Sequence, residues 1–442
     1  MSRILMPSSP IHGHVAPMIQ LGRGLLEHGH RSTVLTGTKY RAAVERAGLD
    51  FLPLPAEADY DDADLDAWLP GRDRYKGLAA VRHDITGMFL RPLPAQHRAL
   101  TAALATGGFD LVLSESAFLG SLPTLLAVPA TERVPVLGIS ALPMTLTSVD
   151  CAPFGPALPP GRSALARLRN RALNGVLHAG PLKPLRTAFE AALAEVGAPP
   201  ARGNVFDQLT AFDLTFQLSA RGLEYPRREL PSTVHFVGPM RPAPRPAADL
   251  PAWWGDLDGG RPVVHVTQGT TDNADPTRLL APAITALAGE DVLVVATTGG
   301  RPVAELLTAL GGELPANARV GEFLPYDRLL PRTDVLVTNG GFGGVQQALA
   351  HGVPLVVAGA TEDKPEVAAR VAWAGAGVNL RTGSPAPQRI RRAVRRVLHD
   401  GTHRRAAVVL QSEIAGYGDP VATVAAAVAD LTSSRAATGP AA

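Results

Sequence analysis

The chain has 442 residues, 46% of them hydrophobic, so we expect two domains of about 200 residues with separate cores. Its 42 Lys and Arg residues nearly balance its 40 Asp and Glu residues, which excludes a nucleic-acid-binding protein that neutralises many phosphates. A single cysteine excludes an intrachain disulfide framework. Since the chain also lacks a signal-peptide pattern and any apolar run as long as a membrane span, we expect a soluble cytoplasmic protein.

The first part of the chain predicts a parallel, doubly wound sheet. Residues 3–7 form an apolar run, and a helix is expected to begin near Ala16 and to end at the glycine stop of His28-Gly29. A β-prone run at 32–35 and a helix at 40–47 follow, and this alternation is typical of such a sheet. Further strands are predicted at 110–113, 134–139, 263–266, 292–296, 335–338 and 355–357.

These strands fall into two groups, which predicts two Rossmann-like domains that face each other across a cleft. We expect the first domain at 1–240 and the second at 261–415, joined by a proline-rich linker at 241–260. A C-terminal helix at 416–433 is expected to pack back on the first domain, and the tail at 434–442 is expected to be disordered.

Residues 334–357 contain the most informative local pattern, a strand, a glycine-rich turn, a short helix and another strand. Glycines at 340, 341, 343 and 344 allow a sharp turn that exposes backbone N–H groups, and the helix expected to start near Val345 adds its positive dipole end. The pattern predicts an anion site that suits a phosphate-bearing ligand. The alternative is a glycine-rich connection that binds nothing.

The loop after the first strand carries two histidines, His12 and His14, ahead of a helix. The helix dipole lowers the proton affinity of a histidine there, which keeps the imidazole neutral and able to act as a general base. The strand that ends at Leu113 is followed by Glu115, whose carboxylate is placed to hold a histidine N–H and to stabilise the imidazolium. The alternatives are a structural histidine and a surface glutamate.

Other chemistries fit less well. A calcium loop starting at Asp62 would have Ala67 in place of glycine and Asp73 in place of glutamate, so the acidic stretch 59–66 is interpreted as a solvated loop. Residues 138–142, which include Ser140, lack the second glycine of a nucleophile elbow. No Walker A or complete dinucleotide motif is present, so neither ATP nor NAD is specifically indicated.

Together these motifs resemble the inverting, metal-independent glycosyltransferases of family 1, and the chain looks like a bacterial natural-product member of that family. The resemblance covers nearly the whole chain and implies the GT-B arrangement of two Rossmann-like domains. GHVAP at 13–17 looks like the family's GHxxP motif, whose histidine is the catalytic base, and this assigns the role to His14. FDLVLSE at 109–115 resembles the strand whose final acid, usually Asp, partners that base; Glu115 stands there.

The second half resembles the family's donor site. VTQGT at 266–270 is similar to its phosphate loop, and FLPY at 323–326 stands where an aromatic ring, here Phe323, stacks on the donor base. The signature histidine for the diphosphate and glutamate for the ribose are replaced by Asn339 and Gln347. The Asn339 amide is expected to donate one hydrogen bond to the phosphate, and Gln347 to bond a ribose hydroxyl, although neither carries the charge of the residue it replaces.

EDKPEVAARV at 362–371 resembles the family's sugar-binding D-Q-P segment, with Asp363 retained to hold sugar hydroxyls and Lys364 in place of Gln. Ser140 is a further candidate for contact with the donor. The complete set of donor-site candidates is Gly269, Thr270, Phe323, Asn339, Gly341, Gly343, Gly344, Gln347, Glu362, Asp363, Lys364 and Ser140.

The resemblance implies transfer of a sugar from a UDP- or dTDP-linked donor to a small hydrophobic or aromatic acceptor, without metal or other cofactor. The expected partners are the nucleotide sugar and the acceptor, with no nucleic acid and no membrane, for a monomer or homodimer. A nucleotide-sugar epimerase and a non-catalytic helper with the same fold are the alternatives. Acceptor-lining candidates in the N-terminal domain are Trp68, Tyr75, Met88, Phe89, Leu90, Met144 and Phe154.

Overall fold

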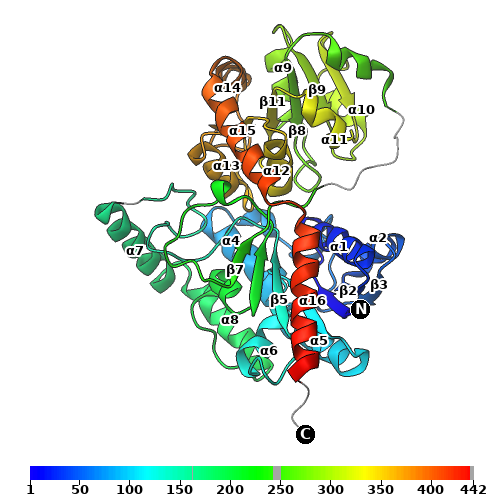
Figure 1. The fold of residues 1–442 in the computed structure, drawn as a ribbon. Coiled ribbons are helices and arrows are strands. Elements are labelled where there is room, and N and C mark those ends of the chain that lie inside the picture. The colour runs from blue at the N-terminus through cyan, green and yellow to red at the C-terminus, as the bar shows by residue number, and fades with distance from the viewer. Residues whose placement is uncertain (162, 242–249, 439–442) are drawn as a thin grey trace.

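The structure is a computed structural model that describes residues 1–161, 163–241 and 250–438 (Figure 1). It contains a seven-stranded and a six-stranded sheet, each with helices on both faces, and the two sheets belong to domains that lie one above the other in Figure 1. This confirms the predicted α/β class with two Rossmann-like domains. Part of the predicted linker, at 242–249, and the end of the predicted tail, at 439–442, lie outside the described residues.

The N-terminal sheet has the strand order β3-β2-β1-β4-β5-β6-β7, and all of its pairs are parallel. Helices cover both of its faces, so its central strands are buried almost throughout. Its strands are β1 (Arg3–Pro7), β2 (Arg31–Thr36), β3 (Asp50–Pro53), β4 (Leu111–Glu115), β5 (Val136–Ser140), β6 (Leu214–Gln217) and β7 (Val234–Phe236). Its helices are α1 (His12–Glu27), α2 (Arg41–Arg46), α3 (Leu65–Trp68), α4 (Leu78–Ile85), α5 (Leu93–Gly107), α6 (Leu122–Ala127), α7 (Ala164–Ala179) and α8 (Lys183–Glu195), with short 3-10 or π turns η1 (Thr38–Tyr40), η2 (Arg72–Arg74), η3 (Thr86–Leu90), η4 (Leu119–Ser121), η5 (Val205–Thr210) and η6 (Arg221–Leu223).

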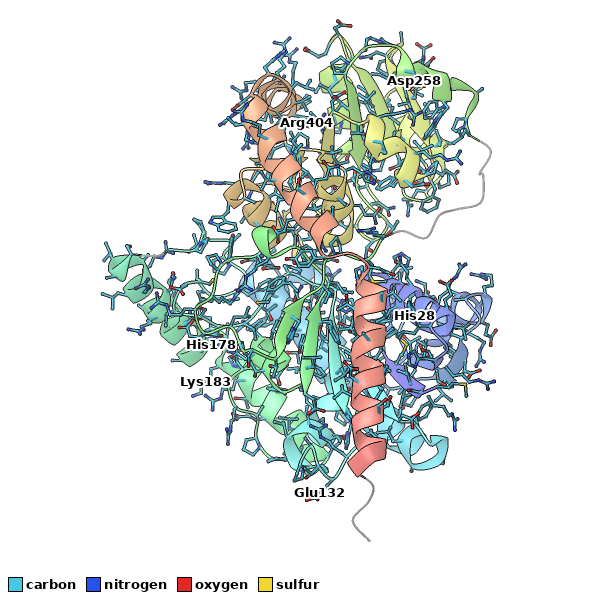
Figure 2. The ribbon with its side chains drawn as sticks, viewed as in Figure 1. His28, Glu132, His178, Lys183, Asp258 and Arg404 are labelled. Carbon is cyan, nitrogen blue, oxygen red and sulfur yellow. The ribbon has the colours of Figure 1, made fainter. Side chains whose placement is uncertain are left out.

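The C-terminal sheet has the order β10-β9-β8-β11-β12-β13, again with parallel pairs. Figure 2 labels Asp258 and Arg404 in this domain and shows side chains between its sheet and its helices. Its strands are β8 (Val263–Thr267), β9 (Leu293–Thr297), β10 (Ala318–Gly321), β11 (Val335–Thr338), β12 (Leu355–Val357) and β13 (Gly377–Asn379). The helices are α9 (Leu280–Leu287), α10 (Val303–Ala309), α11 (Tyr326–Leu329), α12 (Phe342–Ala350), α13 (Lys364–Trp373), α14 (Pro387–His399), α15 (Gly401–Gly416) and α16 (Pro420–Thr438), with 3-10 turns η7 (Ala252–Asp258) and η8 (Leu330–Arg332).

Helix α1 shows how the sequence pattern becomes a packed element. Met18, Leu21 and Leu25 are fully buried against the sheet, and Gly29 adopts the positive φ of 82° that lets the chain turn after the helix. The helix begins at His12 rather than near the predicted Ala16, because the carbonyl of Ile11 already accepts N–H bonds from the first turn. A proline at position 17 signals a nearby N-terminus without marking the first residue.

The last helix of the chain, α16, leaves the C-terminal domain and lies along α1 of the N-terminal domain (Figure 1). Val424, Ala425 and Val428 of α16 are buried in the same apolar cluster as the α1 residues. At the contact point, a Cβ on Gly24 would lie 2.5 Å from Val421, so the two helices approach where glycine leaves space. Among the described helices, none combines the length and apolar character needed to cross a bilayer.

Candidate active site

Two buried side chains meet where the first and fourth strands of the N-terminal sheet end. Strands β1 and β4 are adjacent and parallel, with Ile4 opposite Leu111, so the residues after them reach the same edge of the sheet. His14 in the first turn of α1 and Glu115 at the end of β4 are only 7% and 1% exposed, and His14 Nδ1 lies 3.0 Å from Glu115 Oε1. The structure therefore brings together the two residues that the sequence proposed as base and acid partner.

The carboxylate of Glu115 is oriented by its own loop. Its Oε1 accepts the backbone N–H of Ala117 at 2.8 Å and lies 3.3 Å from the hydroxyl of Ser116, which donates to it. The side chain of Glu115 therefore reaches the imidazole from the end of β4, where the motif resemblance implies an aspartate. Because Nδ1 of His14 faces this carboxylate, Nε2 is the ring nitrogen left to accept a proton.

The surroundings raise the pKa of the His14 imidazole above its ordinary value of 6.5. Burial lowers this pKa because the imidazolium loses hydration, but the charge and hydrogen bond of the Glu115 carboxylate, together with the charges of Asp363 and Asp62, more than offset the loss. The prediction that the helix dipole lowers the proton affinity is therefore wrong, since a carboxylate in contact outweighs the partial charge of a helix end. The raised pKa helps His14 to retain a proton that it has accepted.

The structure separates the roles of the two neighbouring histidines. The side chain of His12 is exposed, whereas that of His14 is buried and paired. His12 contributes its backbone N–H, which donates to Asp62 Oδ2 at 2.7 Å. Among these two, only His14 has the partner and the burial that a general base needs.

Asp62 is a site residue that the sequence analysis missed, and the interpretation of the acidic stretch as a solvated loop is wrong for it. Its side chain is buried, and its Oδ1 accepts from Lys39 Nζ and from the Tyr40 hydroxyl, each at 2.7 Å. The signal that would have found it is strand β3, which ends at Pro53 on the same sheet edge as β1 and delivers the next loop to that edge.

The glycine-rich turn forms the start of helix α12. The helix begins at Phe342 rather than near Val345, and Val345 is the first residue whose N–H donates within it, to the carbonyl of Gly341 at 3.0 Å. The N–H groups of the preceding turn thus have no partner inside the helix. A Cβ on Gly341, Gly343 or Gly344 would meet nothing within 4 Å, so open space adjoins these N–H groups, as the anion-site prediction requires.

Asn339 is used within the protein in a way that the sequence did not indicate. Its side-chain amide is 6% exposed and donates to the backbone carbonyl of Gln268 and, at 3.4 Å, to that of Asp272. We expected this amide to donate to a phosphate, and the structure instead commits it to joining the loops after β8 and β11. Gln347, the other replaced signature residue, lies half-buried on α12.

The loops after β8, β9 and β10 carry further donor-site candidates. Gly269 has φ of +72° and is followed by the exposed Thr270. Phe323 is 55% exposed, and its ring lies over Gly300, where an added Cβ would be 2.7 Å from the ring. An exposed aromatic ring of this kind is available to stack on a flat ligand.

The segment 361–364 carries a compact set of charges at the start of helix α13. Lys364 is 4% exposed, and its Nζ contacts Glu362 and lies 3.7 Å from Asp272 Oδ2. Asp272, which the sequence analysis missed, also accepts from Thr361 Oγ1 at 2.7 Å. The charge of Lys364 is therefore balanced by acids of the protein itself.

Asp363 interacts electrostatically with His14 of the other domain. Burial raises the pKa of its carboxyl, while Lys364 and the imidazole of His14 lower it, so Asp363 and His14 influence each other across the junction of the domains. Glu362, just before it, adopts a positive φ of 54°, a conformation that costs a non-glycine residue free energy and is concentrated at functional sites.

The proposed acceptor-lining residues divide into two groups. Phe89 lies beside the base, with its ring centroid 6.0 Å from that of His14. Trp68 stacks on Tyr60 and donates to the carbonyl of Gly87, close to the buried Met88. The remaining candidates lie elsewhere: Leu90 and Met144 belong to separate core clusters, Tyr75 stacks on His83, and Phe154 packs near Phe206.

Ser140 does not join the donor-site candidates of the C-terminal domain. It ends β5 within the N-terminal sheet, is 2% exposed, and its backbone carbonyl accepts the N–H of Leu218 at 2.8 Å.

Comparisons with known proteins identify the family. Residues 290–431 match the family model "Erythromycin biosynthesis protein CIII-like, C-terminal domain". The chain is 41% identical over 418 residues to 4'-demethylrebeccamycin synthase of Lentzea aerocolonigenes, covering 94% of this chain and 96% of the relative. It is also 34% identical over 431 residues to UDP-glycosyltransferase 2 of Phaeomoniella chlamydospora, covering 93% and 91%.

Solved structures show the same fold. The glycosyltransferase of kitacinnamycin superposes with a TM-score of 0.71 at 24% identity over 97% of this chain and 98% of that one. Glycosyltransferase VinC, solved in complex with DTDP, gives 0.65 at 22% identity over 98% of this chain and 100% of that one. The chain therefore belongs to the GT-B glycosyltransferases of family 1 and is a glycosyltransferase related to the bacterial natural-product enzymes of that family.

Proposed function

We propose that this enzyme transfers a sugar from a UDP- or dTDP-linked donor to a small hydrophobic or aromatic natural product, with inversion at the anomeric carbon and without a metal ion. The observation that carries the proposal is the paired, buried imidazole of His14, which interacts electrostatically with Asp363 of the opposite domain. A base on one side and a sugar-holding carboxylate on the other are what a direct displacement between two bound substrates requires.

In the proposed reaction, His14 Nε2 accepts the proton of an acceptor hydroxyl or amine as that group attacks the anomeric carbon. The new bond forms on one face of the sugar while the bond to the diphosphate oxygen breaks on the other, and the nucleoside diphosphate leaves with the electron pair. Glu115 stabilises the imidazolium through Nδ1. The free N–H groups at the start of α12 and the loop at Thr270 stabilise the charge on the leaving diphosphate.

The names of relatives support the substrate classes without fixing them. A relative is named a UDP-glycosyltransferase, VinC was solved with DTDP, and another relative is named for rebeccamycin, so both nucleotides stay within the proposal. The exposed ring of Phe323 suits either a uridine or a thymidine nucleotide, because stacking on a base is insensitive to the base's identity. Phe89 and Trp68, near the base, provide the apolar contacts that favour a hydrophobic acceptor.

The direct test compares His14→Ala with His12→Ala in transfer assays against a panel of UDP- and dTDP-sugars and aromatic acceptors. We expect His14→Ala to lose on the order of two to four decades in kcat while it retains donor binding, since a general base supplies that much. His12→Ala is the matched control, because its side chain is exposed two residues away, and it should retain activity. The anomeric configuration of the product, read by NMR, should be inverted.

Other outcomes would favour the alternatives. Full turnover by His14→Ala would remove the base from the proposal. Conversion of the nucleotide sugar to its epimer without an acceptor would indicate an epimerase, and absence of both transfer and donor hydrolysis by the wild type would indicate a non-catalytic helper.

A further inference from the structure

A strap of the N-terminal domain, residues 144–157, reaches across to the C-terminal domain. It follows strand β5, the neighbour of β4, whose last residue Glu115 pairs with the base. Loops after adjacent parallel strands emerge at the same edge of the sheet, so the strap starts beside the catalytic pair.

Glu366 of helix α13 binds the far end of the strap. Its Oε1 accepts two backbone N–H bonds, from Gly155 at 2.7 Å and from Ala157 at 2.8 Å. Both strap residues have positive φ, 119° and 55°, and Ala157 is one of few non-glycine residues described in that conformation. A non-glycine residue held there costs roughly 1–3 kcal/mol and persists only where its surroundings enforce it. The two bonds to Glu366 are the visible constraint.

The other end of the strap is bound by the same helix through Arg370, which is 1% exposed. Its Nη1 donates to Glu366 Oε2 at 2.8 Å, its Nε to Glu224 Oε2 at 2.9 Å and its Nη2 to the carbonyl of Met144 at 2.9 Å. Glu224 in turn accepts the N–H of Met144 at 2.9 Å. Since the charges of Arg370, Glu224 and Glu366 are buried together, each depends on the others for compensation.

The same turn of α13 carries the sugar-holding candidate. Asp363 precedes the helix, and its carbonyl accepts the N–H of Glu366 at 3.0 Å, so the two residues are one turn apart. Asp363 interacts with His14, while Glu366 binds the strap. One rigid helix end therefore touches both the donor side of the site and the N-terminal loop that begins beside the base.

We propose that Glu366 is a positioning residue that seats the 144–157 strap against the donor end of α13 and so sets the acceptor in line with the bound sugar. The proposal rests on the function proposed above, in which the acceptor binds in the N-terminal domain. Glu366 does not touch the reacting atoms. With the strap released, the sugar is still bound, but the acceptor is held less closely, and water reaches the anomeric carbon more often.

The test measures how bound donor is partitioned between transfer and hydrolysis in Glu366→Ala. We expect the acceptor KM to rise by about tenfold or more, which corresponds to about 1.4 kcal/mol. The ratio of hydrolysis to transfer should rise with it. The donor KM should stay within about twofold of the wild-type value. Hydrogen exchange at the amides of Gly155 and Ala157 should become faster, a readout that does not depend on turnover.

Glu413→Ala is the matched control. Glu413 of α15 also accepts a backbone N–H from the N-terminal domain, that of Gly222 at 3.0 and 3.1 Å, yet it does not contact the strap. A general loosening of the contact between the domains would change the ratio of hydrolysis to transfer equally in Glu366→Ala and Glu413→Ala. The proposal requires this ratio to change only in Glu366→Ala.

Glu366→Asp guards against a variant that fails to fold. It keeps a carboxylate for Arg370 but is one methylene too short to hold the strap equally well, so hydrolysis relative to transfer should still rise. The proposal is overturned if the partition and the amide exchange of both Glu366 variants match the wild type, or if Glu413→Ala changes them equally. Absence of transfer by the wild type and Glu413→Ala would instead contradict the proposed function itself. The amide exchange of Gly155 and Ala157 would still test whether Glu366 holds the strap.

Discussion

The two halves of the candidate site are built in different ways. In the N-terminal half, His14 and Glu115 are buried and in contact, and a backbone N–H orients the Glu115 carboxylate. In the C-terminal half, the glycines at the start of α12 border open space and Phe323 is 55% exposed. The reacting group is thus fixed in advance by side-chain contacts, whereas the donor side offers main-chain groups and a ring that a ligand must complete.

This difference predicts which property each substitution changes. Altering the prebuilt half should change the rate and its pH dependence with little effect on donor affinity, because the contacts there act on the proton. Altering the open half should change donor affinity with little effect on folding, because little of the protein packs against it.

Glu115→Gln is expected to have the largest effect of any substitution that leaves the base itself in place. Removing the carboxylate leaves burial as the dominant influence, so the pKa of His14 should fall. A base works when neutral, so activity is lost as pH falls through this pKa, and the acidic limb of kcat/KM should move to lower pH. The plateau should drop by about tenfold to a hundredfold, since the imidazolium is no longer stabilised. A pH–rate profile of both proteins measures these changes.

Asp62→Asn provides the graded comparison for that profile. Asp62 acts on the pKa of His14 in the same direction as Glu115 but more weakly, so its acidic limb should shift less and its plateau should fall less. An unshifted limb in Glu115→Gln would show that the pair does not control the reaction.

Gly343→Ala and Gly344→Ala test the open half. Each adds a methyl group where no protein atom lies within 4 Å, and alanine favours helices by up to about 1 kcal/mol, so the melting temperature should not fall. If the diphosphate occupies this space, donor affinity should drop by about tenfold or more, which is about 1.4 kcal/mol. Calorimetric titration with UDP and dTDP measures the loss.

Gly175→Ala is the control for the glycine substitutions. It lies in α7, the helix that carries His178 at the outer side of the N-terminal domain, and a Cβ there also meets nothing within 4 Å (Figure 2). It should leave donor affinity unchanged. Equal donor affinity in all three variants would remove the glycine turn from the donor site.

Phe323→Ala should have a smaller effect on the same half. Stacking on a base contributes about 1–3 kcal/mol, so donor KM should rise by about fivefold or more while kcat changes little. Because the ring is largely exposed, thermal stability should stay close to that of the wild type. Phe323→Tyr, which keeps an aromatic face, should restore donor KM; failure to do so would argue against stacking.

His265→Gln should leave the chemistry unchanged and alter only the pH dependence of stability. Burial lowers the pKa of His265 to about 4, while its ring contacts the Val295 carbonyl at 2.8 Å and the Tyr326 hydroxyl at 2.9 Å. Because the unfolded chain takes up a proton near pH 6.5 and the folded chain does not, stability is lost as pH falls from about 6.5 towards 4.

In His265→Gln this slope, at most about 1.4 kcal/mol per pH unit, should be absent. Denaturant unfolding at several pH values between 7.5 and 4.5 measures it. Equal slopes in the two proteins would mean that His265 does not couple to folding.

The central strands could be predicted because each is an apolar run that helices cover on both faces. Strands β3, β6, β7, β10 and β13 were not predicted, since they are only three or four residues long and lie at or next to a sheet edge, and all but β6 are only partly buried. The pairing of His14 with Glu115 followed from parallel strands that end at one edge. The alternation of elements predicts that these strands end at one edge, and the choice of His14 over His12 came from the resemblance of residues 13–17 to the GHxxP motif.

Other site features depend on contacts that no local pattern encodes. The sequence could not indicate that Asn339 is committed to the carbonyl of Gln268, because that bond depends on how two loops face each other. Asp62 could not be distinguished from its acidic neighbours, because a stretch rich in aspartate has the composition of a solvated loop, and only the structure shows that Asp62 is buried. Glu366 looks like an ordinary first-turn acid until the second domain is positioned against it.

The course of α16 has a consequence for how the molecule is made. Residues of this final helix, among them Val424 and Val428, complete the apolar layer over α1, and Ser2 bonds to Thr432. During synthesis, the apolar surface of α1 that α16 covers therefore stays exposed until α16 itself has been made. The N-terminal domain expressed without α16 should therefore not fold independently. Its solubility should depend on adding the α16 segment as a separate chain.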